Sequence, residues 1–462
     1  MRTIKTPIIP THHTFAKVKG VHELNKEAIC VFLAIGFFLD EDTYWRDQIT
    51  LKPASIYTLD ADGYIVDRKA WFQWFHSPKD ITFEEALNEF TILFEKIVDE
   101  QVGDQKVILP LSGGLDSRSQ ATALKHLAKK VQGYSYDFKG GYPETKIAKK
   151  IAKTCDFDFK EYHIGKSYLW EVIEELARIN QCYSEFTHPR QMAIIREFET
   201  MGDVFSLGHW GDVLFDKQTA ERLDEEAQID LLLKKVVKKG GAELASDLWD
   251  YWELGTDFNG YLRERFQTLL KEFDIENTSA RIRAFKSYYW APRWTSTNLS
   301  VFQEKRGVTL PFYDDRMCEF ICTMPEEYLA DRKLQLAYIK KRNKELGKIT
   351  WQSQKPFNLY TFPKNKFPFN FPYRVWSKIK REGNAIFGNP YIQRNWELQF
   401  LGKENDEQLK RYLFGDELLA LIPKEYVEKF YERFQKGDKI AYSHSVSMLL
   451  TLALKMKQIR DE

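Results

Sequence analysis

The residues best suited to chemistry in this chain are Ser112-Gly-Gly-Leu-Asp-Ser117. An apolar run over residues 107–111 precedes them and apolar residues with helical spacing follow, which indicates a strand, a glycine turn and the start of a helix. Free backbone N–H groups and the helix dipole favour a phosphate at such a position. The hydroxyls of Ser112 and Ser117 and the carboxylate of Asp116 can add contacts to phosphate and Mg²⁺. The loop lacks the lysine of a Walker nucleotide site, so it is a phosphate loop of another type.

Three further segments carry groups suited to the same chemistry. Gly208 and Asp212 follow an apolar run, so we expect them at the carboxyl end of a strand, where α/β sheets bind ligands. The carboxylates of Asp116 and Asp212, with phosphate oxygens, would make a site suited to Mg²⁺. Residues 307–315 form an apolar run that closes in a proline turn and two acids. Lys355 precedes a proline, and a lysine is a compact charge suited to a leaving pyrophosphate.

An α/β scaffold is needed to bring these groups together. Strand-like and helix-like runs alternate over residues 82–208, which predicts a parallel sheet with helices packed on it. The expected helices are 82–101 and 144–153, and the expected strands are 107–111, 131–138, 159–164 and one ending at 204–208.

The residues before this core and the residues after it have different secondary-structure patterns. Residues 1–80 are expected to be β-rich, helical patterns dominate beyond residue 208, and the stretch 356–373 is expected to be an ordered irregular loop or lid. We therefore predict a domain of residues 1–80 followed by one of residues 81–462, with its α/β core at about 105–220.

Composition limits the classes of protein. The 68 basic and 67 acidic residues balance, so no nucleic-acid partner is expected. The longest apolar run, residues 28–38, is shorter than the ~18–20 residues that span a bilayer, and no membrane partner is expected. The first residues do not have the pattern of a secretory signal. Five cysteines, an odd number, suggest reduced thiols and a cytoplasmic location.

Together these motifs resemble the synthetase domain of the asparagine synthetase family, within the wider ATP pyrophosphatase superfamily. The resemblance covers roughly residues 105–460. It rests on SGGLDS at 112–117, G-x-x-x-D-x-[LV]-F at 208–215, [VL]-P-F-x-D at 310–314 and Q-K-x-F at 354–357. It implies an adenine nucleotide α-hydrolase-like (HUP) fold with a helical C-terminal part, and ATP and Mg²⁺ as cofactors.

The resemblance also implies roles for individual residues. Asp116 and Asp212 would bind Mg²⁺, and Lys355 would neutralise charge that develops on pyrophosphate. The nucleotide would contact the loop and the neighbouring strand end through Ser112, Gly113, Gly114, Leu115, Asp116, Ser117 and Gly208.

Several positions depart from the family pattern. Glutamine-using members carry a nucleophilic cysteine directly after the initiator methionine, whereas this chain has Arg2 there, and its first cysteine, Cys30, lies in an apolar run. We therefore interpret residues 1–80 as a reduced glutaminase-like remnant without glutaminase activity. His209 and Val213 replace two glutamates of the family, which weakens the expectation that aspartate is the substrate. His209 could deprotonate an attacking amine or serve a structural role.

The leading hypothesis is an ATP-dependent ligase that adenylates a carboxylate and transfers the acyl group to ammonia or an amine. Its expected partners are a small-molecule or peptide carboxylate and an amine donor, and a homodimer or a partner subunit stays open. Candidate substrates are a sugar uronic acid, a metabolite carboxylate and a peptide side chain. The last would make the protein a macrolactam-forming cyclase of the lasso-peptide type. Two alternatives remain: a tRNA-modifying ATP pyrophosphatase and a non-catalytic nucleotide-binding relative.

Overall fold

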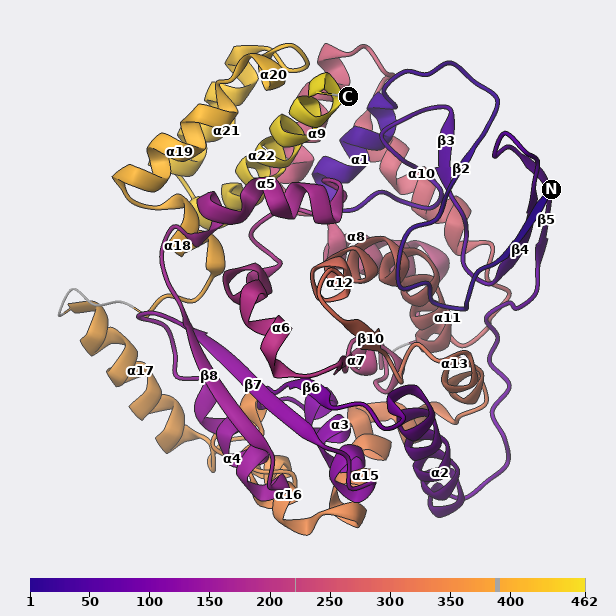
Figure 1. Ribbon diagram of the computed structural model, residues 1–462, viewed down its shortest axis with the longest axis vertical. Coiled ribbons are helices and arrows are strands. Elements are labelled where there is room, and N and C mark those ends of the chain that lie inside the picture. The colour runs from indigo at the N-terminus through magenta and orange to yellow at the C-terminus, as the bar shows by residue number, and fades with distance from the viewer. Residues whose placement is uncertain (221, 387–390, 462) are drawn as a thin grey trace.

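A five-stranded parallel sheet lies at the centre of the computed structural model, which describes residues 1–220, 222–386 and 391–461 (Figure 1). The strand order is β10-β9-β6-β7-β8, and all neighbours pair in parallel. Because the central strand β6 pairs with β9, the residues that follow both strands meet at one edge of the sheet. The strands are β6 (Val107–Pro110), β7 (Val131–Phe138), β8 (Asp158–Ile164), β9 (Val204–Ser206) and β10 (Gly307–Thr309).

Helices cover both faces of this sheet. Helices α3 and α4 pack against it on one side, with α2 beside α3, and η1, α6 and α12 lie on the other side (Figure 1). Their bounds are α2 (Phe83–Val102), α3 (Leu115–His126), α4 (Thr145–Cys155), η1 (Arg190–Glu197), α6 (Phe198–Met201) and α12 (Ser296–Gln303). The predicted α/β class and the expected strands and helices are confirmed. The strand β10 was not among the expected strands, although it begins the apolar run noted at residues 307–315.

The first part of the chain contains the expected β structure. Strands β1 (Arg2–Lys5), β4 (Ser55–Leu59) and β5 (Ile65–Ala70) form an antiparallel sheet, and β2 (Phe15–Lys17) pairs with β3 (Gln48–Thr50). The apolar run at residues 28–38 is the exception, because it forms most of helix α1 (Lys26–Ile35), which is buried all round. A run that is apolar on every side has no periodicity that separates a buried strand from a buried helix.

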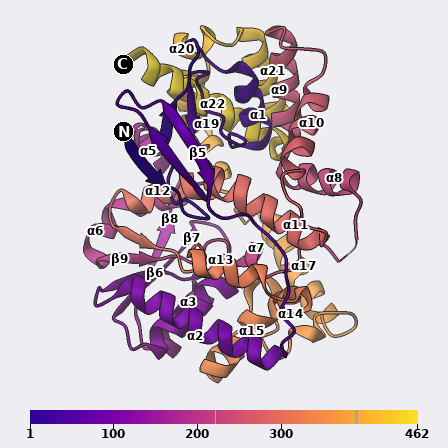
Figure 2. The same ribbon diagram turned by 90° about the vertical axis from the view of Figure 1, so that its right-hand side faces the viewer.

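Helix α1 packs against α9 (Lys239–Tyr251), which in turn packs against α22 (Lys439–Asp461) near the end of the chain. Figure 2 shows this helical group at one end of the molecule and β6 with α3 toward the other end. One continuous buried cluster includes apolar residues of α1, of the sheet and of α22. The domain limits 1–80 and 81–462 remain a prediction.

The remaining elements are mostly helices, as expected, and in the described ranges none is long and apolar enough to cross a bilayer. The stretch 356–373 is largely irregular, apart from one short turn and the start of α17. These elements are α5 (Tyr168–Asn180), α7 (Gly211–Leu214), α8 (Glu225–Val236), α10 (Phe258–Leu270), α11 (Thr278–Phe285), η2 (Lys286–Thr295), α13 (Asp315–Cys322), α14 (Glu326–Leu329), η3 (Ala330–Arg332), α15 (Lys333–Arg342), α16 (Lys344–Lys348), η4 (Gln352–Gln354), η5 (Phe362–Lys364), α17 (Phe371–Ile386), α18 (Asn395–Phe400), α19 (Lys403–Leu413), α20 (Asp416–Leu419) and α21 (Lys424–Lys436).

A fully buried arginine, Arg118, fastens the phosphate loop to the segment that follows α16. Its guanidinium donates to the carbonyl oxygens of Ile349 at 3.0 Å and Thr350 at 2.8 Å. It also donates at 3.3 Å to the carbonyls of Leu346 and Gly113. Burial lowers the pKa of Arg118 to about 10, which leaves it charged at neutral pH. One side chain therefore holds the loop and a segment more than 200 residues away in a single arrangement.

We expect Arg118→Met to lower the free energy of unfolding by about 2–4 kcal/mol, because it leaves several buried carbonyl groups without donors. Urea titration of the purified protein measures this. The control is Arg178→Met, since Arg178 forms an exposed ion pair with Glu304 that should contribute less than about 1 kcal/mol. Equal losses in the two variants would contradict the role given to Arg118.

Candidate active site

The phosphate loop joins β6 to α3 and is held by its own hydroxyls. Ser112 Oγ lies 3.0 Å from Ser117 Oγ, and the Ser112 N–H donates to Ser117 Oγ at 3.1 Å. The Gly114 N–H donates to Ser112 Oγ at 3.2 Å. No side chain of the described ranges caps the start of α3, so its first-turn N–H groups are available to an anion. The Leu115 side chain is in the core, which leaves only its backbone for a nucleotide contact.

The loop is tied to the segment that contains Lys355. The Gly113 N–H donates to Gln352 Oε1 at 2.9 Å, and the Gln352 N–H donates back to the Gly113 carbonyl at 3.0 Å. The first N–H of the glycine pair is therefore not free, in contrast to the expectation from sequence. Lys355 follows the short turn η4, three residues beyond Gln352. Within the described ranges its Nζ has no hydrogen bond or ion pair, and Lys355 does not line the cavity that contains Asp116.

The two predicted metal ligands line one cavity of about 410 Å³. Asp116 projects from the first turn of α3, and Asp212 is exposed on the short helix α7. Burial raises the pKa of the Asp116 carboxyl, the Arg332 guanidinium opposes this rise, and the neighbouring Asp212 adds to it. Arg332 donates to Asp116 Oδ1, and Gln335 Nε2 donates to the same oxygen at 3.1 Å. Sequence reasoning brought the two acids together but missed the arginine.

The donor set fits a Mg²⁺ ion that arrives with ATP. Across residues 1–220, 222–386 and 391–461, no three His, Cys, Asp or Glu side chains gather closely enough to hold a metal by themselves. Mg²⁺ often uses one or two carboxylates together with substrate phosphates and waters. Asp116 and Asp212 can supply those two carboxylates. Arg332, which donates a hydrogen bond to Asp116 Oδ1, would have to share that oxygen with the metal or give up the hydrogen bond.

The backbone that carries Arg332 is unusual. Asp331 and Arg332 both have left-handed backbone angles, with φ of 56° and 60°, although neither is glycine. Such residues cost on the order of 1 kcal/mol each and persist where surrounding contacts fix them. The Asp331 N–H donates to Asp216 Oδ1 at 3.1 Å, and Arg332 Nε donates to Gln335 Oε1 at 2.6 Å. These contacts keep a guanidinium directed at the phosphate loop.

Close backbone packing explains two glycines of the Gly208–Phe215 element. A Cβ atom at Gly208 would lie 2.9 Å from the carbonyl carbon and the Cβ of Asp116, and one at Gly211 would lie 2.2 Å from Asp116 Oδ1. Any side chain at either position would displace the carboxylate. Gly208 and Gly211 therefore both pack against Asp116 of the loop, and the expected contact of Gly208 with the nucleotide stays a prediction.

Three tryptophans and a lysine also line this cavity. Trp210, Trp290 and Trp294 line it together with Lys286. Lys286 is buried, its Nζ lies 5.4 Å from the ring centre of Trp290, and it donates to Gln218 Oε1 at 2.9 Å. Burial lowers the pKa of Lys286 to about 8; Lys235 adds to this effect and Asp212 opposes it. No motif pointed to this lysine in the sequence.

The structure places His209 in the same cavity, next to Gly208. Its Nδ1 is buried and has no hydrogen-bond partner within the described ranges. Burial lowers the pKa of His209 to about 4, although Asp212 opposes the shift, so the ring is neutral at physiological pH. A neutral ring can accept a proton, but a pKa this low makes it a weak base.

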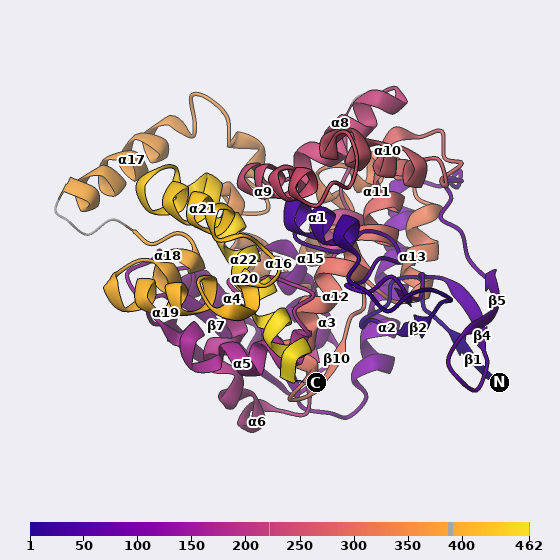
Figure 3. The same ribbon diagram turned by 90° about the horizontal axis from the view of Figure 1, so that it is seen from above.

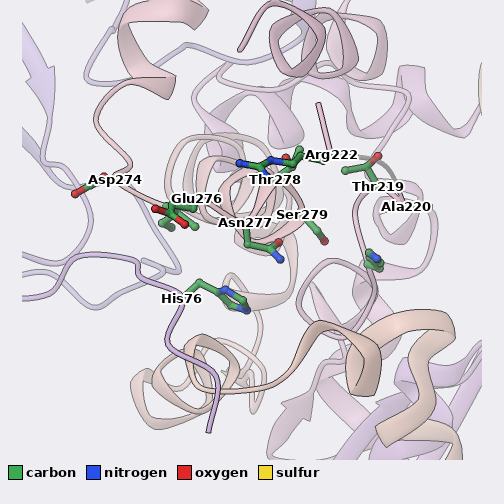
Figure 4. Close-up of a pocket in the computed structure, with 11 residues that line it drawn as sticks. His76, Thr219, Ala220, Arg222, Asp274, Glu276, Asn277, Thr278 and Ser279 are labelled. Atoms are coloured by element: carbon green, nitrogen blue, oxygen red, sulfur yellow. The ribbon is translucent and has the colours of Figure 1, made fainter. Parts of the chain in front are cut away.

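A larger cavity of about 670 Å³ lies elsewhere, and its lining comes from three separate segments (Figure 4). His76 lies between β5 and α2, and residues 274–279 lead into α11. The third segment follows α7 and supplies Lys217, Thr219, Ala220 and Arg222. Its lining, as far as the structure describes it, includes neither Asp116 nor the phosphate loop. The smaller cavity is therefore the candidate active site.

Comparison with known proteins shows the family to which the chain belongs. The sequence profile of asparagine synthase matches residues 89–456, most of the chain, so the chain belongs to the asparagine synthase family. This confirms the resemblance drawn from the motifs, and it makes the protein an ATP-dependent amide-forming ligase in the general sense. No curated protein matches the chain. Among solved structures, NMN synthetase from Francisella tularensis is 13% identical with a TM-score of 0.23, over 45% of this chain and 93% of that one.

We expect Gly211→Ala to weaken the affinity for ATP in the presence of Mg²⁺ by at least about tenfold, because the added methyl group would displace the Asp116 carboxylate. Isothermal titration calorimetry measures this. The control is Gly165→Ala, where an added Cβ would meet no atom within 4 Å and affinity should not change. Wild-type affinity in Gly211→Ala would show that Asp116 does not contribute to nucleotide binding.

Proposed function

We propose that this protein activates a carboxylate with ATP and joins the acyl group to an amine that it does not itself release from glutamine. The observation that carries this proposal is the single cavity shared by the phosphate loop, the Asp116–Asp212 pair and Lys286. One side of that cavity suits phosphate and Mg²⁺, and the other side offers a cation to an organic anion. A site with both parts can hold ATP and a carboxylate next to each other.

In the first step a carboxylate oxygen of the substrate attacks the α-phosphorus of ATP, and the bond to the leaving pyrophosphate breaks. Bound Mg²⁺ would neutralise charge on the phosphates. The hydroxyls of Ser112 and Ser117 and the N–H groups at the start of α3 would hold the phosphate oxygens. Arg332, and Lys355 on the segment tied to the loop, would stabilise the charge that develops on pyrophosphate.

In the second step the amine nitrogen attacks the acyl carbonyl carbon, the bond to AMP breaks, and the amine loses a proton. We propose that His209 Nδ1 accepts that proton. Two observations support this role: His209 lines the cavity, and its Nδ1 has no hydrogen-bond partner within the described ranges. Because burial lowers the pKa of His209 to about 4, the ring is neutral and can accept a proton, as a weak base.

Lys286 and the tryptophans would set the substrate class. The buried ammonium would pair with the substrate carboxylate before activation, since a buried cation is most stable beside an anion. The indole rings of Trp290 and Trp294 offer flat apolar surfaces that suit a ring or an apolar chain. We therefore favour a carboxylate attached to a ring or an apolar group over a small and fully polar acid.

The cysteines support an external source of the amine. All five are buried, and burial raises the pKa of each thiol, to about 12 for Cys155 and Cys182 and to about 11 for Cys322. A thiol of this kind is not a nucleophile at neutral pH. None of the cysteines in these 462 residues is therefore suited to glutamine hydrolysis.

The test is pyrophosphate release from ATP with Mg²⁺, an amine and a panel of ring-bearing and apolar carboxylic acids. We expect Asp116→Asn and Asp212→Asn each to lower the rate by at least about 100-fold, because each removes a charge that binds the metal. The control is Asp104→Asn on an exposed turn, which should leave the rate unchanged. No glutamate should form from glutamine.

Two results would overturn this proposal. One is a wild-type protein that releases no pyrophosphate with any acid and amine, together with an Asp116→Asn variant that binds ATP as tightly as wild type. The other is release of glutamate from glutamine by the purified chain, which would contradict an external amine source.

The pH dependence tests Lys286 separately. The pKa of Lys286 is about 8. The ammonium group that would bind the substrate carboxylate is therefore present below pH 8 and is lost as the pH rises above 8. We expect kcat/KM for the carboxylate, measured by ATP–pyrophosphate exchange, to fall above pH 8 in wild type. In Lys286→Arg the fall should disappear up to about pH 10, since arginine stays charged. Lys166→Arg, at an exposed position, should keep the wild-type profile, and an unchanged profile in Lys286→Arg would rule out this role.

A further inference from the structure

Helix α17 and the segment before it expose an apolar surface that the active site does not use. Six large apolar side chains are between 39% and 76% exposed there. We call this set the α17 patch; it consists of Phe367, Phe369, Phe371, Val375, Trp376 and Ile379. Figures 1 and 3 both place α17 at the periphery of the molecule.

The helix presents its apolar side to solvent, which is the reverse of the usual arrangement. Phe371, Val375 and Ile379 follow each other at intervals of four residues and so share one side of α17. The partly covered residues Tyr373 and Ser377 lie on the other side. A helix on a globular protein normally turns its apolar side toward the core. Among the described residues, no other part of the chain therefore covers the exposed side of α17.

The charges around the patch are almost all positive. Residues 360–386 contain six basic side chains and a single acid, Glu382, whereas the whole chain has a net charge of only +1. Lys380 Nζ lies 5.4 Å from the ring centre of Trp376, and Lys378 lies 3.7 Å from Glu382. The six basic residues are Lys364, Lys366, Arg374, Lys378, Lys380 and Arg381. An apolar strip bordered by cations suits an anionic surface with an apolar interior.

The segment is fixed to the body of the protein just before the helix begins. Asn370 is buried and donates through Nδ2 to Asn365 Oδ1 at 3.1 Å. Asn365 in turn donates to Gln354 Oε1 at 2.7 Å, on the segment that is tied to the phosphate loop. The patch therefore has a defined orientation relative to the active site.

We propose that the α17 patch binds the surface of an anionic lipid bilayer. The phenylalanines, Trp376 and Ile379 would enter the boundary between headgroups and acyl chains, and the lysines and arginines would contact lipid phosphates. A second copy of this chain is a poorer occupant, because a two-fold contact through the patch would bring the same cations toward each other. This surface attachment needs no membrane-spanning helix and does not depend on the proposed reaction.

Flotation of the full-length protein with phosphatidylcholine vesicles, with and without phosphatidylglycerol, tests this proposal. We expect binding only to the phosphatidylglycerol vesicles, and weaker binding as salt rises. Trp376→Ser/Ile379→Ser should lower the partition coefficient by at least about tenfold, through the loss of two inserted side chains. Arg374→Gln/Lys378→Gln should lower it by about tenfold and reduce the salt dependence.

The matched control is Ile92→Ser/Ile440→Ser, because these two isoleucines are 68% and 59% exposed on other helices. This variant should bind vesicles as wild type does, and circular dichroism should show that all the variants fold. The proposal would be overturned if the protein bound neither kind of vesicle, or if the control lost as much vesicle binding as Trp376→Ser/Ile379→Ser. It would also be overturned if light scattering showed a dimer that Trp376→Ser/Ile379→Ser, but not the control, dissociates.

Discussion

The contact between Arg118 and four backbone carbonyls is the interaction on which the site depends. It joins the first turn of α3 to residues 346–350, which lie more than 200 positions further along the chain. A charge buried without a carboxylate beside it is stable only when several dipoles point at it, and here carbonyl groups from two segments do so. The same contact holds the segment with Gln352 and Lys355 against the loop, so the phosphate loop and a candidate pyrophosphate contact form one rigid unit.

The α/β core was predictable because its signals are local. Strand β7 matches residues 131–138 as expected, since Tyr134, Tyr136 and Phe138 alternate with polar residues, which is the period-2 pattern of a strand. The meeting of Asp116 and Asp212 also followed from sequence, because each comes just after a strand and neighbouring parallel strands end at one edge. The helix α1 was not predictable in this way, because its apolar residues surround the whole helix and leave no period to read.

The groups that sequence reasoning missed act over long separations. Arg332 contacts Asp116 across 216 positions, and Lys286 enters the cavity from a helix that carries no recognised motif. Both residues reach the site only because the folded chain brings distant segments together. The residues next to them in the sequence form no motif that would mark them. Together they give the site a balance of two acids and two cations, so neither ATP nor a carboxylate meets an uncompensated charge when it enters.

The place of α1 in the fold has a consequence for how the protein is made. Helix α1 packs mainly against α9, more than 200 positions later, and its Leu33 carbonyl also accepts a hydrogen bond from His444 in α22. At the usual pace of synthesis of about 5–20 residues per second, α1 waits roughly 10–45 s for α9. During that time an entirely apolar helix has no native surface to cover it. This side of α1 therefore cannot reach its native packing until α9 has been made, and the newly made N-terminal region needs protection from aggregation until then.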